Sequence, residues 1–302
     1  GMGVLCVTPA LESTGWVSVE LLSHSEVLRS GGSFYVHSAL WVSAVLPSSG
    51  PVSGGTRLAV IGSGFREAAT MRCRMEESSG TAVARVVSEG QLECTAPAAS
   101  GEGARVVEVS MNGQQYSSSS VEYTYRAAAV VSSVVPSRGA AEGGTPVTVL
   151  GSGFSAAAEA LGELWCRFNS TASRAAYVSE SALTCNTTAS AAGVASVEVS
   201  TNGREYTSSG VQFEVVSLVV RGIAPWSGPS LGGTVVTIAG SRLGESAEAV
   251  LCRFGRLVGS HAASAHGSDG VRCVSPSSLP TGWSSVELSV HGTALRSGGS
   301  LY

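Results

Sequence analysis

The seven cysteines are the most regularly placed of the reactive side chains in this chain. Six of them form three pairs whose members lie about 20 residues apart: Cys73 and Cys94, Cys166 and Cys185, and Cys252 and Cys273. This spacing contains no CxxC and no neighbouring histidine, so a zinc site is the weaker interpretation. One pair in each similar segment predicts one disulfide per domain and an oxidising compartment. Cys6 is left over, and we expect its partner about 20 residues upstream, outside this sequence.

The sequence gives little support for a catalytic site. A Ser-His-Asp triad would have to use Asp269, the only aspartate, and no Gly-x-Ser-x-Gly turn precedes a helix. His261, His266 and Asp269 share one loop, but their spacing in a Ser/Ala-rich segment favours a solvated loop over a metal site. We therefore predict that the chain is not an enzyme and has no catalytic residue, no cofactor and no metal site.

Two triplets match the N-glycosylation pattern Asn-x-Ser/Thr. They begin at Asn169 and Asn186, and both lie in the segment that contains Cys166 and Cys185. In an oxidising compartment we expect N-linked glycans at these asparagines. Trp16 and Trp283 occupy matching positions of two repeats, and we expect them to pack in domain cores.

The amino-acid composition argues against several further classes of function. The 302 residues include no lysine, so all 18 basic residues are arginine, and the net charge is −4. An acidic chain without a basic patch is a poor nucleic-acid binder. A single aspartate also argues against calcium-bridged domains. No apolar run reaches the length of roughly 20 residues that a membrane span needs, so we expect no direct membrane insertion.

Internal repeats determine the domain organisation. Pro47, Pro136 and Pro225 follow one another at equal steps of 89 residues, and a Gly-Gly-Thr triplet follows each proline. The segment from Cys6 to Tyr35 also matches the segment from Cys273 to Tyr302, at an offset of three such steps. We therefore predict the C-terminal part of a truncated domain over 1–37, followed by complete domains over 38–126, 127–216 and 217–302.

Each repeat is a series of short alternating apolar and polar runs separated by Gly and Ser, which is typical of strands. In the first complete repeat the predicted strands span 41–46, 57–62, 70–75, 82–87, 91–95, 104–111 and 121–125. Asn112-Gly113, Asn202-Gly203, His291-Gly292 and His24-Ser25 are predicted two-residue hairpin turns. No segment has sustained helical periodicity. The predicted fold is all-β, as tandem immunoglobulin-like β-sandwich domains with one disulfide each.

The order of these features resembles the IPT/TIG domain family. The features are Pro-x-x-Gly, Gly-Gly-Thr, an apolar strand, Gly-x-Gly-Phe, two cysteines, and a valine-rich strand before Asn-Gly. Gly62-Ser63-Gly64-Phe65 fits this pattern well, whereas Gly240-Ser241-Arg242-Leu243 lacks the second glycine and the phenylalanine. The resemblance covers essentially the whole chain. It implies either tandem copies in extracellular proteins, such as plexins and fibrocystin-like proteins, or single copies in Rel-type transcription factors and starch-acting enzymes.

The repeats, the paired cysteines and the acidic charge favour the extracellular setting. We expect a non-enzymatic array at the cell surface that acts as a structural spacer, in adhesion or as a filament, for example of a surface or ciliary hair. The alternative is the ligand-binding ectodomain of a plexin-like or fibrocystin-like single-pass receptor. Expected partners are other copies of the chain, other surface or matrix proteins and N-linked glycans, but not nucleic acid. A carbohydrate-binding accessory domain would require paired exposed aromatic side chains.

Overall fold

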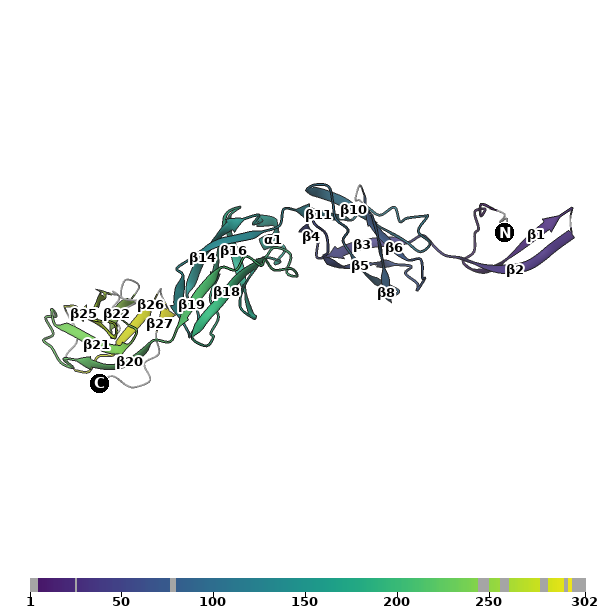
Figure 1. Ribbon diagram of the computed structural model, residues 1–302. Coiled ribbons are helices and arrows are strands. Elements are labelled where there is room, and N and C mark those ends of the chain that lie inside the picture. Colours follow the sequence, from purple (N-terminus) through teal and green to yellow (C-terminus); the bar gives the residue numbers. More distant parts are fainter. Residues whose placement is uncertain are drawn as a thin grey trace. The chain divides into compact units, whose positions relative to one another are not determined.

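Figure 1 shows the computed structural model of the chain, which is almost entirely β-structure. It describes residues 5–24, 26–76, 80–243, 250–255, 261–277, 282–290 and 293–294. The chain divides into two compact units, Gly1–Arg126 and Ala127–Tyr302. The predicted all-β fold of immunoglobulin-like sandwiches, with three disulfides over three domains, is confirmed.

The first unit begins with a hairpin of two strands, β1 (Gly15–Ser23) and β2 (Glu26–Val36). The strands are antiparallel, and Ser23 pairs with Glu26 across the turn. This register agrees with the hairpin turn expected at His24-Ser25, where His24 has a φ of 48°. Ser25 itself lies outside the described residues.

Two sheets form the sandwich of the first complete domain. One contains β3 (Trp41–Leu46), β5 (Arg57–Ser63), β9 (Gln91–Thr95) and β8 (Arg85–Ser88) in that order. The other contains β4 (Ser49–Pro51), β11 (Glu122–Arg126), β10 (Gly103–Ser110), β6 (Arg72–Met75) and β7 (Thr81–Val83). The alternating pattern of each strand turns its apolar residues inward, where Val60, Leu92, Val107 and Tyr123 are fully buried.

The structure departs from the predicted strands at two places. The predicted strand 82–87 is broken at Ala84, and its halves, β7 and β8, join different sheets. The short strand β4 was missed, because three residues beside Pro47 carry no alternating pattern. It pairs in parallel with β11, and this pairing joins two segments that lie far apart in the sequence.

The predicted two-residue hairpin at Asn112-Gly113 is wrong. The Oδ1 of Asn112 accepts hydrogen bonds from the backbone N–H groups of Gln114 and Gln115, at 2.9 and 3.1 Å. This local turn of the side chain competes with strand pairing, and the chain remains a loop until β11. The related turn at Asn202 accepts from Arg204 and Glu205 in the same way. His291-Gly292 lies outside the described residues.

In the second complete domain one long strand joins the two layers. β16 (Thr171–Ser179) pairs with β15 (Trp165–Phe168) through its first half and with β17 (Ala182–Asn186) through its second. The resulting sheet has the order β12-β14-β17-β16-β15-β18-β19-β13. Its remaining strands are β12 (Val130–Val135), β13 (Arg138–Ala140), β14 (Pro146–Ser152), β18 (Gly193–Ser200) and β19 (Gln212–Val216). A five-residue helix, α1 (Ala156–Ala160), was not predicted.

The third complete domain repeats the two layers. One sheet has the order β20 (Val219–Ala224), β21 (Val235–Ser241), β25 (Gly270–Val274) and β24 (Ser264–Ala265). The other has the order β23 (His261–Ala262), β22 (Val250–Phe254), β26 (Val286–Val290) and β27 (Thr293–Ala294). Each of the repeated prolines Pro47, Pro136 and Pro225 follows a cis peptide bond.

A glycine on β5 and another on β14 allow a large apolar side chain to pack closely against the strand. A Cβ atom on Gly62 would come within 2.6 Å of the ring of Phe65, and one on Gly151 within 2.8 Å of the ring of Phe154. These positions therefore exclude any larger residue. Phe65 and Phe154 are almost completely buried, and Leu243 fills the same place in the third repeat.

Candidate functional site

Each disulfide lies inside one domain and links its two layers. Cys73 on β6 is bonded to Cys94 on β9, and Cys166 on β15 is bonded to Cys185 on β17. Cys252 on β22 is bonded to Cys273 on β25. The sulfurs are buried, so these cysteines belong to the cores and offer no reactive thiol. Cys6 is exposed and has no disulfide partner within this chain.

Both sequon asparagines are exposed on the second complete domain. Asn169 lies in the turn between β15 and β16, where its Oδ1 accepts a hydrogen bond from the backbone N–H of Ser196 at 2.8 Å. Asn186 is the last residue of β17. Exposure leaves both amides accessible to modification, and glycans at Asn169 and Asn186 remain a prediction.

The loop that contains Asp269 was weighed as a metal site in the sequence. Asp269 instead contacts the neighbouring turn, because its Oδ1 accepts a hydrogen bond from the backbone N–H of Arg242 at 3.3 Å. Within the described ranges, no three His, Cys, Asp or Glu side chains come together in an arrangement that could hold a metal ion. In the same part of the chain, no helix is long and apolar enough to cross a membrane.

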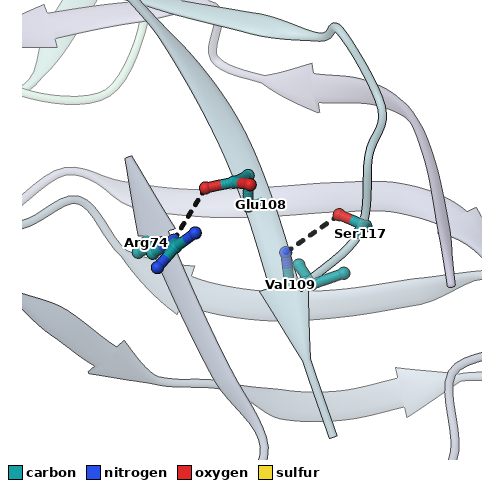
Figure 2. Close-up of polar contacts among 4 residues, drawn as sticks. All are labelled: Arg74, Glu108, Val109 and Ser117. Carbon is teal, nitrogen blue, oxygen red and sulfur yellow. Dashed lines mark hydrogen bonds and ion pairs between the residues drawn. The ribbon is translucent and has the colours of Figure 1, made fainter. Parts of the chain in front are cut away.

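An arginine–glutamate pair on neighbouring strands is a surface feature that the sequence analysis missed. Figure 2 shows Arg74 of β6 and Glu108 of β10 pointing toward one another, with their Nε and Oε2 atoms 2.7 Å apart. The guanidinium of Arg74 also lies 3.8 Å from the centre of the Tyr116 ring. The hydrogen bond to Glu108 raises the pKa of Arg74, so this arginine stays charged.

The loop beside this pair is held to the same strand. The backbone N–H of Val109 donates to the hydroxyl of Ser117 at 3.1 Å (Figure 2), and the N–H of Ser117 donates to the carbonyl of Val109 at 2.8 Å. The serine side chain therefore supplies a hydrogen bond that a paired strand would otherwise make.

The other repeats carry versions of the same feature. Arg253 and Glu287 form an ion pair at 2.6 Å in the third domain. In the second, Arg167 lies 4.1 Å from the centre of the Tyr206 ring, but the buried Glu198 accepts hydrogen bonds from the Thr207 hydroxyl and the Ser209 N–H. An arginine directly after the first cysteine of each repeat was the signal that could have located these pairs.

A second missed feature lies at the junction inside the unit 127–302. Glu214, on the last strand of the second domain, contacts two arginines with its two carboxylate oxygens. One is Arg138 of β13 at 3.3 Å, which belongs to the same domain, and the other is Arg242 of the next domain at 2.6 Å. All three side chains are partly exposed, between 33% and 45%, so each ion pair by itself contributes only about 0–1 kcal/mol.

Arg242 occupies a position that is glycine in the other repeats. Its φ is 58°, and the corresponding Gly64 and Gly153 have φ values of 81° and 77°. A side chain in this left-handed conformation costs roughly 1 kcal/mol relative to glycine. The contact with Glu214 across the junction gives a physical reason for the departure from the Gly-x-Gly-Phe pattern.

Apolar residues close the same junction. Ala140 and Val216 belong to the second domain, yet they pack in the buried cluster of the third domain together with Leu218. The exposed fractions of the three are 2%, 2% and 4%. Only Ser217 and Leu218 separate β19 from β20. The two domains therefore share part of one core, which forms an apolar interface inside the unit 127–302.

The expectation that Trp16 and Trp283 pack in domain cores is wrong. Their exposed fractions are 72% and 69%. Trp16 contacts Tyr35 edge to face, with ring centres 5.2 Å apart, and Trp283 stacks with Trp226, with ring centres 6.2 Å apart and planes 18° apart. The error arose because matched positions in repeats can be surface positions as well as core positions.

Trp16 and Tyr35 also border a pocket of about 600 Å³ within the unit 1–126. Phe65, Arg66 and Glu67 of the first complete domain line its other side. The guanidinium of Arg66 lies 5.5 Å from the centre of the Tyr35 ring, a distance typical of a cation–π contact. The terminal hairpin and the domain that follows it thus meet through aromatic and arginine side chains.

Two curated relatives of this chain are Fibrocystin-L proteins. The chain is 37% identical to Fibrocystin-L of Homo sapiens over 116 residues, which are 36% of this chain and 3% of that protein. It is 26% identical to Fibrocystin-L of Mus musculus over 201 residues, which are 66% of this chain and 4% of that protein. The chain therefore spans only a small part of the length of these relatives.

A solved structure of the Plexin A4 full extracellular region resembles 83% of this chain and is matched over 23% of its own length. The sequence identity is 19% and the TM-score is 0.47. The sequence profile of the IPT/TIG domain matches residues 40–125, 129–215 and 218–302. With three matches over most of its length, the chain belongs to the IPT/TIG domain family.

Proposed function

We propose that this chain is part of a non-enzymatic extracellular array that spaces or presents binding surfaces at the cell surface or in the matrix. The observation that carries the proposal is the junction inside 127–302, where Ala140, Val216 and Leu218 are buried between domains and Glu214 bridges two arginines. A fixed relation between successive domains is what a spacer requires, because a flexible linker would let the distance between its ends vary.

The disulfides support the extracellular part of the proposal. One buried disulfide in each domain is typical of proteins that fold in an oxidising compartment. The similarity to Fibrocystin-L points in the same direction. N-linked glycans at Asn169 and Asn186 belong to this proposal, since they are added only in the secretory route.

Lateral contact between copies is the finer part of the proposal, and it leads to adhesion or filaments. Val83 and Val87 are exposed by 69% and 49% on β7 and β8, which end their respective sheets. Edge strands with exposed valines can pair with other chains unless charged side chains prevent it. Arg85, between them, and glycans elsewhere on the surface are the features that oppose such pairing. Other copies of the chain or other surface proteins are the proposed partners.

A second candidate function is the ligand-binding ectodomain of a fibrocystin-like or plexin-like receptor. The identity of 37% with Fibrocystin-L of Homo sapiens favours it. It differs from a free array in requiring a membrane anchor elsewhere in the complete protein. Both candidates place these domains outside the cell.

The proposal is tested by labelling cells that express the complete protein with antibodies raised against this chain. We expect labelling of intact cells, and a mobility shift of the protein after treatment with peptide N-glycosidase that is reduced by Asn169→Gln and Asn186→Gln. Labelling that requires permeabilised cells, together with free thiols at Cys73 and Cys94, would overturn the proposal. Electron microscopy of the purified protein then distinguishes filaments from separate spacers.

A further inference from the structure

Trp226 and Trp283 form an exposed aromatic pair on the domain 217–302. Their exposed fractions are 70% and 69%, and their ring planes are inclined by only 18°. Indole side chains are the type most enriched among the residues that dominate protein interfaces. Two of them exposed side by side on a soluble domain therefore indicate a surface that another molecule covers.

The repeat places both tryptophans at the end of the domain where a junction forms. In the second domain the residue equivalent to Trp283 is Val194, which pairs directly with Glu214. The residue equivalent to Trp226 is Ser137, which immediately precedes Arg138, the other strand partner of Glu214. On 127–216, these positions thus flank the ion pair that the next domain contacts through Arg242.

The first unit shows what such a tryptophan faces when another domain is present. Trp16 is equivalent to Trp283 and lines a pocket together with Phe65, Arg66 and Glu67 of the domain that follows it. Arg66 lies over the ring of Tyr35, which is the edge-to-face partner of Trp16. Arg66 is therefore the group that approaches the aromatic pair of Trp16 and Tyr35.

We propose that Trp226 and Trp283 form a docking surface for another IPT/TIG domain, one that presents an exposed arginine and glutamate as Arg66 and Glu67 do. The arginine would lie against an exposed indole face, where cation–π attraction adds to the burial of apolar surface. This inference rests on the proposed array function and names the partner of one of its surfaces.

The chain carries a suitable loop, so a second copy of the chain is the probe. The core of the domain 38–126 consists only of its own residues and is closed by its own disulfide, which allows a chain shortened to residues 38–302 to fold. This shortened chain presents both the 65–67 loop and the tryptophan pair. We expect it to associate head to tail, because the hairpin that lies against the loop in the full chain is removed.

Sedimentation velocity over a range of concentrations measures this association. We expect Trp226→Ala and Trp283→Ala to weaken it at least tenfold, as for residues that dominate an interface. Arg66→Ala should weaken it to a similar degree. Leu161→Ala is the matched control, because Leu161 is 60% exposed on a different domain and should leave association unchanged. The full chain of 302 residues should associate more weakly than the shortened one.

Results of two kinds would overturn the proposal. One is a shortened chain that stays monomeric at millimolar concentration, or an association that the tryptophan variants do not change. The other is quenching of tryptophan fluorescence by a panel of neutral oligosaccharides, lost in Trp283→Ala while the chain stays monomeric, which would assign the surface to a sugar. Neither result affects the labelling of intact cells, so failure here is distinguishable from failure of the proposed function.

Discussion

Two junctions of the same chain use different residues at equivalent positions. In the junction between 127–216 and 217–302, Arg138 and Glu214 are strand partners and Arg242 completes the ion pairs. After the domain 38–126, the equivalent strand partners are Ser49 and Thr124, and Gly153 stands in place of Arg242. None of these three residues carries a charge.

The residues that supply apolar contacts at the second junction also have different counterparts after the domain 38–126. Val216 and Leu218 are buried at the second junction, whereas Arg126 and Ala129 occupy the matching places at the first. The boundary between the two compact units falls between Arg126 and Ala127 and not between Val216 and Ser217. A few residues at the end of the second domain thus allow it to share a core with the third.

Removal of a disulfide should have the largest effect on the free energy of unfolding, and it should shift the transition of only one of the two units. Replacing Cys252 and Cys273 with alanine opens a loop of about 20 residues and should lower the free energy of unfolding by about 3 kcal/mol. If 127–302 unfolds as one unit, differential scanning calorimetry will show its transition moving while that of 1–126 stays in place.

Replacing Cys73 and Cys94 with alanine is the matched control and should move only the transition of 1–126. If the Cys252 and Cys273 replacement leaves a separate, unshifted transition for 127–216, the second junction does not couple its domains.

Leu218→Ala should have the next largest effect. The side chain is 4% exposed and packs with residues of both domains, so its truncation should cost about 2–4 kcal/mol of the free energy of unfolding of 127–302. Chemical denaturation measures this loss. Leu231→Ala, at a site that is 86% exposed in the same domain, should change the stability by less than about 0.5 kcal/mol. Equal effects of the two substitutions would show that Leu218 is not a junction residue.

Alkaline pH should have a smaller effect on stability, and this effect should differ between the two units. Burial raises the pKa of Tyr125 to about 12, although Arg105 opposes the shift, and its hydroxyl donates to the carbonyl of Pro97 at 2.6 Å. Because the folded-state pKa lies above the ordinary value of 10.0, this stabilisation is complete below pH 10 and is lost as the pH rises to about 12.

The second domain has Val215 at the equivalent position, so only the transition of 1–126 should show this alkaline loss. Tyr125→Phe should lower the stability of 1–126 by about 1 kcal/mol at neutral pH and remove the difference between pH 10 and 12. A loss of the same size in 127–302 would assign the pH dependence to other groups.

The charged contact at the junction should give the smallest effect on stability. Glu214→Gln removes the anion shared by Arg138 and Arg242 and should cost about 1 kcal/mol or less, because the side chains are partly exposed. The cost should shrink at high salt, where the ion pairs of the unaltered chain are screened. Glu93→Gln, which removes a more exposed pair with Arg85, is the control and should have no measurable effect.

The sequence predicted the architecture well because the repeat and the alternating strands are local patterns. The period of 89 residues and the paired cysteines predicted the sandwich fold with one disulfide in each domain. Strand β4 and the split of the predicted strand 82–87 escaped prediction, since both depend on pairing with distant segments. The hairpin at Asn112 failed because a side-chain hydrogen bond outcompeted strand pairing.

The candidate site was harder to predict. Glu214 and Arg138 look like ordinary surface charges in the sequence, and only their strand register places them together. Arg242 was visible as a departure from the Gly-x-Gly-Phe pattern, but the sequence alone does not show which residue it contacts. The exposure of Trp283 likewise depends on how the segment before β26 packs, which the sequence alone does not show.

The most direct test of the shared core compares the motions of the two domains in 127–302. Nuclear magnetic relaxation of backbone ¹⁵N nuclei gives the rotational correlation time of each domain within the full chain. We expect one common time for 127–216 and 217–302, and two different times after Leu218→Ala and Glu214→Gln are combined. Different times for these domains in the unaltered chain would contradict the claim that Ala140, Val216, Leu218 and Glu214 fix this junction.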